Sequence, residues 1–246
     1  MTYDNIYFYD TLDSTNEKLK ALSEGSDIPE FSVVATSFQT AGRGQEGNAW
    51  ESEQGKNMTV SILLKPEFLS PADQFYISKI VSIALRDTLE KYGINSEIKW
   101  PNDIYAGNKK IAGILIENSI MGAALSVSIA GVGLNVNQKV FLSDARNPVS
   151  MINILKKETD LNEVQSIFLQ NLYMLYNALK DEKFAEIDKR YFNSLYRRNG
   201  LHRFKDSGGV FMAEITGVEP MGHLVLTDTD GEIRKYAFKE VEFVLE

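Results

Sequence analysis

The spacing of apolar residues changes along the chain between the period of a helix and that of a strand, which predicts an α+β protein with a mixed sheet. Ser14 and Glu17 have capping-box spacing at the start of a helical apolar face that ends near Gly25. Residues 31–38 and 58–64 are rich in Val, Ile, Leu and Thr, as strands are. The first part of the chain therefore predicts one short helix and two strands.

A longer helix is the clearest prediction in the middle of the chain. Pro71 follows Ser70 at its start, apolar residues recur at core spacing, and Gly93 supplies a stop. Strands are then expected at 96–100, 109–117, 123–130 and 132–136.

The pattern of apolar residues changes from helical spacing to short strands after Gly200. Before it, two segments with helical spacing run from about Glu163 to Leu179 and from Phe184 to Tyr196. After it, short strands separated by glycine turns are expected at 210–218, 224–227, 235–238 and 241–244. This pattern predicts a small β-barrel of about 45 residues behind one larger domain.

Composition limits the chemistry of the chain. Its 246 residues contain no cysteine and two histidines, which excludes disulfides, thiolate zinc sites and a cysteine nucleophile. A net charge of -8 argues against a nucleic-acid partner, since phosphate binding needs a concentrated basic face. No apolar run approaches the roughly 20 residues of a membrane span, and the first residues do not resemble a signal peptide. We therefore expect a cytoplasmic protein without a membrane partner.

A glycine-rich loop has the glycine spacing of a dinucleotide-binding motif, with glycines at Gly42, Gly44 and Gly47. A Rossmann loop leads directly into an amphipathic helix, whereas residues 48–55 are polar and carry no apolar stripe. The pattern indicates instead a flexible loop whose amides and Arg43 wrap an anion, with a plain surface loop as the alternative.

Two lysines indicate a site for a carboxylate or phosphate. Lys99 and Trp100 end an extended run at Pro101, which fixes an ammonium and an indole at the end of a strand. Lys110 opens the next strand, where Gly113 allows another group to approach the backbone closely. For Lys110 and its neighbour Lys109, a solvated surface pair is the alternative interpretation.

Two further blocks are ambiguous by themselves. Asp13-Ser14-Thr15-Asn16 is typical of a helix cap, and the free amides and hydroxyls at such a place also bind a neutral polar group. Gly131-Val132-Gly133-Leu134-Asn135 fits a strand with glycine kinks.

These four blocks, in the order in which they follow one another along the chain (13–16, 39–50, 99–115 and 131–137), resemble the signature of the biotin protein ligases. The resemblance implies a mixed-sheet catalytic domain of the biotin/lipoate ligase type over residues 1–198 and a small C-terminal SH3-like β-barrel over residues 199–246. Because the pattern begins almost at Met1, the chain is similar to the monofunctional form that lacks an N-terminal DNA-binding domain.

The resemblance implies activation of biotin by ATP to biotinyl-5′-AMP, with Mg²⁺ accompanying the triphosphate, and transfer to a lysine of a biotin carboxyl carrier protein. Lys99 and Arg43 are implied to be catalytic, because they neutralise the reacting carboxylate and α-phosphate. The implied biotin-binding residues are Ser14, Thr15, Asn16, Gln39, Gly42, Arg43, Gly44, Gln45, Lys99, Gly113, Leu115, Gly131 and Gly133. The implied ATP-binding residues are Arg43, Gln45, Asn48, Trp50, Lys99, Asn102, Lys110 and Asn135. No metal ligand is assigned, and Asp103 is either a base or a brace for the turn.

A lipoate or octanoate ligase of the same fold and a non-catalytic biotin-binding sensor are the alternative functions. A homodimer formed through a sheet edge, and the carboxylase subunit that is modified, are left open. One position departs from the family, because many members carry Arg where this chain has Gln45. Loss of this cation is expected to weaken retention of the reactive intermediate.

Overall fold

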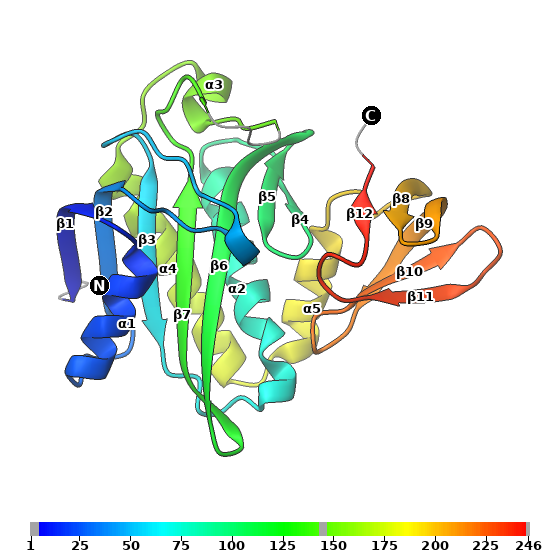
Figure 1. The fold of residues 1–246 in the computed structure, drawn as a ribbon, viewed down its shortest axis with the longest axis horizontal. Helices are drawn as coiled ribbons and strands as arrows, with labels where there is room; N and C mark the ends of the chain where they lie inside the picture. The colour runs from blue at the N-terminus through cyan, green and yellow to red at the C-terminus, as the bar shows by residue number, and fades with distance from the viewer. Residues whose placement is uncertain (1–4, 143–146, 245–246) are drawn as a thin grey trace.

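Two sheets side by side form the molecule (Figure 1), as seen in a computed structural model that describes residues 5–142 and 147–244. The large sheet has the strand order β1-β2-β3-β7-β6-β5-β4, in which β1 and β2 are parallel and the other neighbours are antiparallel. Its strands are β1 (Ile6–Leu12), β2 (Val33–Gln39), β3 (Met58–Leu64), β4 (Glu97–Lys99), β5 (Asp103–Ala106), β6 (Lys109–Met121) and β7 (Ala124–Leu134).

Helices cover both faces of the large sheet. Helix α1 (Thr15–Gly25) covers one face, and α2 (Phe75–Lys91) and α4 (Leu161–Lys180) cover the other. Helix α5 (Phe184–Asn193) packs against α2, and the short α3 (Met151–Leu155) lies beyond the ends of the strands (Figure 1). Adjacent strand residues point to opposite faces, so Ile62 joins the core under α2 and α4 while Leu63 joins a smaller core with Leu19 of α1. Every residue of β3 is consequently buried. The centre of the sheet is therefore held from both sides.

The second sheet is antiparallel, with the order β11-β10-β9-β8-β12. Its strands are β8 (His202–Asp206), β9 (Gly209–Val218), β10 (Leu224–Asp228), β11 (Ile233–Tyr236) and β12 (Glu242–Phe243). The described strands show no pairing between β11 and β12. The short strands expected after Gly200 are confirmed as a second antiparallel sheet, and its described pairings form an open sheet where a barrel was expected.

A tight joint connects the two sheets. The chain leaving α5 pairs with β4, because the Ile98 N–H donates to the Ser194 carbonyl and the Tyr196 N–H donates to the Ile98 carbonyl. The buried Trp100 donates its indole N–H to the carbonyl of Gly222 at 2.8 Å and packs edge-on against Phe238. Trp100 is thus a joint between the sheets.

Most predicted elements are present, with some corrections. The long helix begins later than expected, because Pro71–Asp73 is a short 3-10 turn before α2. The two strands predicted at 123–130 and 132–136 are the single strand β7, since β3 and β6 pair along both of its sides and hold it straight through its glycines. The unpredicted elements are β1, β5, β8 and α3. No helix in the described ranges is long and apolar enough to cross a membrane.

Candidate functional site

A cavity of about 830 Å³ opens on the α1 face of the large sheet. The register explains its position. Leu63 and Ile129 pack under α1, but further along the same face their places are taken by small residues, where Ser61 pairs with Gly131 and Thr59 pairs with Gly133. The face is therefore hollow just beyond the start of the helix. Besides the sequence-predicted residues, the lining includes Thr59, Trp100, Asp103, Tyr105, Ile114, Val132, Pro148, Phe238, Lys239, Val241, Glu242 and Phe243.

The floor of the cavity depends on two glycines of β7. A Cβ on Gly131 would lie against the carboxamide of Asn16, and a Cβ on Gly133 would overlap the Trp50 indole. Both side chains therefore approach the strand backbone more closely than any other residue type allows. The small residues of this strand give the cavity its depth.

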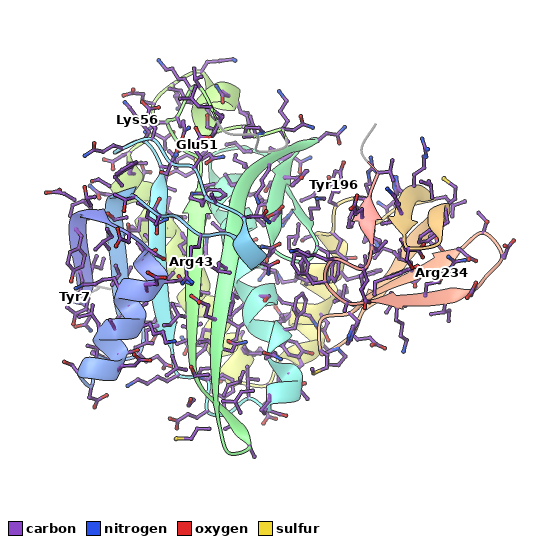
Figure 2. All side chains as sticks on the ribbon, in the orientation of Figure 1. Tyr7, Arg43, Glu51, Lys56, Tyr196 and Arg234 are labelled. Atoms are coloured by element: carbon purple, nitrogen blue, oxygen red, sulfur yellow. The ribbon has the colours of Figure 1, made fainter. Side chains whose placement is uncertain are left out.

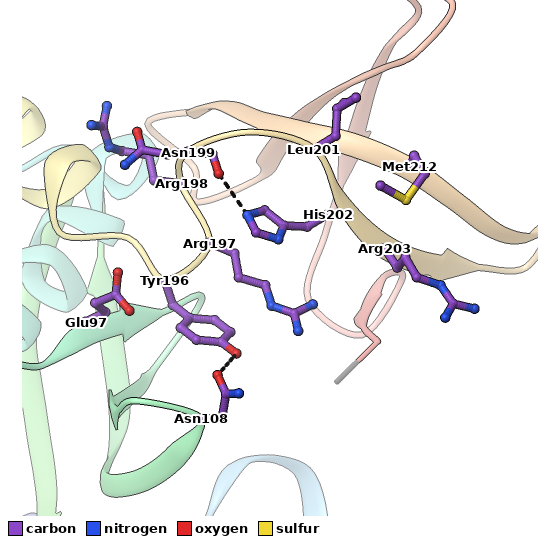
Figure 3. A pocket seen from close by; sticks show the side chains of 10 residues that line it. All are labelled: Glu97, Asn108, Tyr196, Arg197, Arg198, Asn199, Leu201, His202, Arg203 and Met212. Carbon is purple, nitrogen blue, oxygen red and sulfur yellow. Dashed lines mark hydrogen bonds between the residues drawn. The ribbon is translucent and has the colours of Figure 1, made fainter. Parts of the chain in front are cut away.

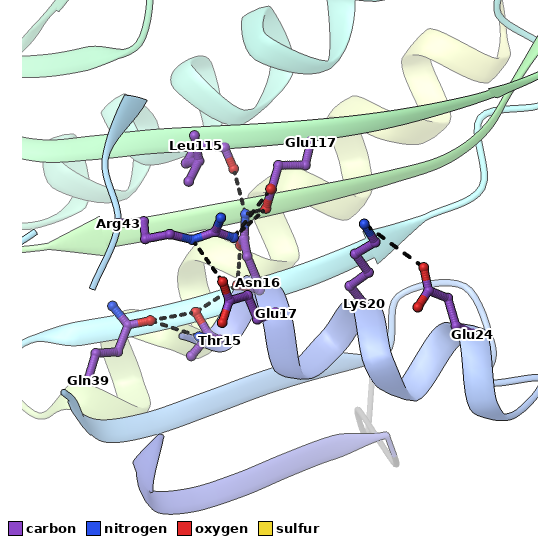
Figure 4. Close-up of polar contacts among 10 residues, drawn as sticks. Thr15, Asn16, Glu17, Lys20, Glu24, Gln39, Arg43, Leu115 and Glu117 are labelled. Carbon is purple, nitrogen blue, oxygen red and sulfur yellow. Dashed lines mark hydrogen bonds and ion pairs between the residues drawn. The ribbon is translucent and has the colours of Figure 1, made fainter. Parts of the chain in front are cut away.

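One end of the cavity is a neutral hydrogen-bonding cluster at the start of α1 (Figure 4). The Thr15 N–H and hydroxyl both donate to Gln39 Oε1, at 2.8 and 3.1 Å. The Ser61 hydroxyl lies 2.7 Å from Thr15 Oγ1 and 2.6 Å from Asn16 Oδ1. Thr15, Asn16 and Ser61 are nearly inaccessible to solvent, so this end is organised before a ligand enters. Ser14 is also buried there.

The predicted capping box is wrong. Ser14 occupies the N-cap position, but its side chain makes no capping hydrogen bond. Glu17, the other member of the expected box, forms an ion pair with Arg43 at 3.4 Å instead. The first turn of α1 is therefore tied to the glycine-rich loop.

The glycine-rich loop folds back on itself over the cavity. The Gly44 N–H donates to the Asn48 carbonyl at 2.6 Å and the Trp50 N–H donates to the Gly42 carbonyl at 2.9 Å, on either side of the 3-10 turn Gln45–Gly47. Arg43 points toward α1 and β6 (Figure 2) and lies 3.3 Å from Glu117. The loop has internal order, and no amphipathic helix follows it, so a Rossmann site is absent from the described chain.

The other end of the cavity is cationic and aromatic. Lys110 Nζ lies 2.6 Å from Asp103 Oδ1 and 5.6 Å from the Trp50 ring centre. Lys99 Nζ lies 5.0 Å from the ring centre of Tyr105 and 5.4 Å from that of Phe243, which belongs to the second sheet. Two ammonium groups, on β4 and β6 with β5 between these strands, therefore face one end of a single cavity, opposite its neutral end.

Other predicted residues brace the walls. Asn102 Nδ2 donates to the Ile114 carbonyl at 2.8 Å, and Asn135 Nδ2 donates to the Val149 carbonyl at 3.1 Å. The Asn135 Oδ1 atom is buried and has no hydrogen-bond partner among the described residues. Their side chains thus hold the strand ends while lining the cavity.

The cavity brings together every predicted site residue except Gly42. Gly42 lies behind the lining, where a Cβ would meet the Trp50 carbonyl and the Gln39 side chain. Sequence reasoning missed the contributions of Glu117, Ser61, Tyr105 and the C-terminal segment. Glu117 had a detectable pattern, because it follows Leu115 by two residues on the same face of the strand. The C-terminal residues are brought here by the second sheet and carry no motif.

A second cavity of about 500 Å³ lies at the joint between the sheets (Figure 3). Its polar groups are largely engaged with one another and with the backbone. The Tyr196 hydroxyl donates to Asn108 Oδ1 at 2.8 Å, Arg197 donates to the Val244 carbonyl at 2.8 Å, and His202 Nε2 is 2.9 Å from the Asn199 carbonyl. Burial raises the pKa of Glu97 in this region. These contacts fasten the connecting segment to both sheets.

Comparison with known proteins bears on the family of the chain. The model of the biotin/lipoate A/B protein ligase family matches residues 8–135. The chain is 28% identical over 243 residues to the bifunctional ligase/repressor BirA of Bacillus subtilis, covering 97% of this chain and 74% of that protein. It is 33% identical over 129 residues to the biotin–[acetyl-CoA-carboxylase] ligase of Paracoccus denitrificans, covering 50% of this chain and 51% of that protein.

A solved structure has the same fold. The biotin protein ligase from Aquifex aeolicus in complex with biotin and ATP superposes with a TM-score of 0.82 at 23% identity, covering 98% of this chain and 100% of that chain. The chain belongs to the biotin/lipoate A/B protein ligase family. The resemblance found in the sequence blocks is thereby confirmed at the level of the family and of the fold.

Proposed function

We propose that this chain joins biotin to AMP and then transfers the biotinyl group to a lysine of a biotin carboxyl carrier protein. The observation that carries the proposal is the polarity of the cavity. Its neutral end at Thr15, Asn16 and Gln39 suits a ureido ring, the space between its two ends leaves room for an aliphatic chain, and its Lys99 and Lys110 end suits a carboxylate meeting phosphates.

In the first step a biotin carboxylate oxygen attacks the α-phosphorus of ATP, and pyrophosphate leaves. Two anionic groups must meet, so the barrier falls when fixed cations neutralise them. We assign this neutralisation to Lys99 and Arg43. In this structure Arg43 is paired with Glu17 and Glu117 at the other end of the cavity, so its role requires the guanidinium to leave these carboxylates when the substrates bind. Lys110 is a second candidate because it lies beside Gly113 and Trp50 on the cavity wall. In the second step the amine of the acceptor lysine attacks the acyl carbon, and AMP leaves.

The remaining residues take roles by their place in the cavity. Ser14, Thr15, Asn16, Gln39, Gly44, Gln45, Gly113, Leu115, Gly131 and Gly133 are proposed to contact biotin, with Gly42 shaping the loop behind them. Asn48, Trp50, Asn102, Lys110 and Asn135 are proposed to contact ATP. Mg²⁺ is proposed to enter with the triphosphate, because the described residues contain no group of three metal-ligating side chains.

Two further parts of the proposal concern organisation and partner. We propose a catalytic domain over residues 1–198 and a smaller C-terminal domain over residues 199–246, which supplies Phe238 and Phe243 to the same cavity. The Paracoccus relative is named for acetyl-CoA carboxylase, which supports a carboxylase carrier domain as the acceptor. Lipoate or octanoate is the second candidate acid, because the family includes ligases for lipoate.

The test is exchange of labelled pyrophosphate into ATP with the purified chain, in the presence of biotin or lipoate. We expect exchange with biotin alone, and a loss of at least about a hundredfold in Lys99→Ala, which removes a charge at the reacting centre. Lys109→Ala is the matched control, because Lys109 is an exposed neighbour on β6 that does not line the cavity. Exchange with lipoate alone would mean that the chain is a lipoate ligase. Binding of biotin without exchange would mean that it is a non-catalytic biotin-binding sensor.

A further inference from the structure

Glu117 on β6 lies between the two groups that frame the neutral end of the cavity (Figure 4). Its Oε2 accepts a hydrogen bond from Asn16 Nδ2 at 2.6 Å, and its Oε1 lies 3.3 Å from Arg43 Nη2. The Asn16 contact is short and charge-assisted and involves a side chain that is 3% exposed. The Arg43 side chain is 42% exposed, and such ion pairs contribute little. The contact with Asn16 is therefore the stronger of the two.

The surroundings of Asn16 allow one orientation of its carboxamide. Nδ2 has two hydrogens, which point to Glu117 and to the Leu115 carbonyl at 3.3 Å. Asn16 Oδ1 lies 2.6 Å from the Ser61 hydroxyl and can only accept, so the single Ser61 hydrogen belongs to this contact. Rotation of the carboxamide by half a turn would place Oδ1 against two acceptors, the carboxylate of Glu117 and the carbonyl of Leu115. Glu117 adds the negative charge that makes this reversal most costly.

This orientation decides which ligand group Asn16 can meet. Its two N–H donors are used by the protein, while Oδ1 has a second lone pair and lies over Gly131 on the cavity floor. A ligand group that meets this oxygen must therefore be a hydrogen-bond donor, either an N–H or an O–H. A ring with an N–H beside a carbonyl satisfies this requirement, and an aliphatic or sulfur ring does not.

We propose that Glu117 is a positioning residue that selects the N–H-bearing ring of the substrate by holding Asn16 with its oxygen toward the cavity, an inference that rests on the proposed function. Glu117 does not touch the substrate. It acts through Asn16, and its contact with Arg43 is secondary.

The test is the Kd for biotin of the purified full chain without ATP, measured by calorimetry. Glu117→Ala removes the acceptor for Asn16, and we expect Kd to rise at least about tenfold, as for a lost hydrogen bond to a charged group. Glu117→Asp keeps the charge but shortens the side chain by one methylene, and we expect the same weakening. Glu117→Gln keeps an oxygen of the right reach, and we expect Kd to stay within about threefold of the native value.

Glu17→Gln tests whether a carboxylate next to Arg43 affects biotin binding without Asn16, because Glu17 forms an ion pair with Arg43 and makes no contact with Asn16 among the described hydrogen bonds. We expect it to bind biotin as the native chain does. Three outcomes would overturn the inference while leaving the proposed function intact. The first is a rise in Kd for Glu17→Gln as large as that for Glu117→Ala. The others are a rise for Glu117→Gln as large as that for Glu117→Ala, and a native Kd for both Glu117→Asp and Glu117→Ala. If Glu117→Ala does not fold, the inference is tested by the other two variants, for which we expect weaker biotin binding in Glu117→Asp than in Glu117→Gln. Failure of the native chain to bind biotin would overturn the proposed function and this inference together.

Discussion

At the scale of single residues, the cavity depends on side-chain atoms that are missing from β7. A Cβ added to Gly131 would press on the Asn16 carboxamide, which Glu117 and Ser61 hold in place. Overpacking of this kind costs about 1–3 kcal/mol. We expect Gly131→Ala to weaken biotin binding about tenfold in calorimetry. Gly25→Ala is the control, because a Cβ there meets nothing within 4 Å, and equal affinities in both variants would contradict the assignment.

Gln45 is the residue at which this chain departs from the family pattern. It lines the cavity in the glycine-rich loop, and its buried Oε1 has no hydrogen-bond partner among the described residues. An arginine here would add a charge-assisted hydrogen bond, worth about 1.5–3 kcal/mol, to the phosphate of the intermediate. We expect Gln45→Arg to slow escape of biotinyl-5′-AMP at least about tenfold in a chase experiment. Gln45→Met, which is similar in length and uncharged, should not slow the escape of biotinyl-5′-AMP. Equal escape rates for the native chain and Gln45→Arg would contradict a role for a cation at this position in retaining the intermediate.

At the scale of elements, helix α4 is fastened to the start of β2 by the carboxylate of Glu30. Glu30 accepts hydrogen bonds from the Tyr176 hydroxyl at 2.5 Å, the Lys65 N–H at 2.9 Å and Lys180 Nζ at 2.7 Å. Burial acts to raise the pKa of Glu30, but the hydrogen bonds from Lys180 and Tyr176 outweigh it and leave the pKa below its usual value of 4.5. Glu30 therefore stabilises the fold above the unfolded pKa, and this contribution is lost as pH falls through the folded value.

The lowered pKa of Glu30 predicts how the stability of Glu30→Gln, relative to the native chain, changes with pH. We expect the variant to lose about 1 kcal/mol of unfolding free energy at pH 7, because a neutral amide makes weaker hydrogen bonds than a carboxylate. The difference from the native chain should shrink as pH falls from about 5 toward 3, where the native carboxyl is also neutral. Urea unfolding at several pH values measures it. Glu24→Gln is the control on an exposed side chain, and a pH-independent difference for Glu30→Gln would contradict the account.

How far the sequence predicts these elements depends on how each one is stabilised. Strand β3 and helix α4 bury continuous apolar faces, so their own residues specify them. Strand β1 is an edge strand whose exposed residues include Phe8, and β5 is short and only half-buried at its ends, so each depends on neighbours in the sheet. The helix cap failed for a related reason, since Glu17 found a tertiary partner in Arg43.

The candidate site was predictable where residues of one function are adjacent in sequence, as in the blocks around Asn16, Arg43 and Lys99. Partners set by strand register were not predictable in the same way. Ser61 reaches Asn16 across 45 positions, and Glu117 reaches it across 101. Phe243 reaches Lys99 only because a separate sheet folds beside β4. Long-range geometry, and not residue type, decides these contacts.

At the scale of the whole molecule, the two sheets share one cavity, and Trp100 is one of the residues that connect them. Its N–H is given to the Gly222 carbonyl, its ring contacts Phe238, and the neighbouring Lys99 lies under Phe243. Loosening this joint should therefore disturb the cationic end of the cavity more than the neutral end at Thr15 and Asn16, which the large sheet and α1 build alone.

Trp100→Phe tests this coupling between joint and cavity. It leaves a buried carbonyl unpaired, and we expect a loss of about 1–3 kcal/mol in unfolding free energy. We also expect the KM for ATP in pyrophosphate exchange to rise severalfold while the Kd for biotin stays near the native value. Tyr236→Phe is the matched control, because it removes a 2.7 Å hydrogen bond to Asp206 inside the second sheet, away from the joint. It should lose stability without a change in the KM for ATP. If both variants raise this KM equally, general loosening of the second sheet, and not the Trp100 joint, controls the ATP end of the cavity.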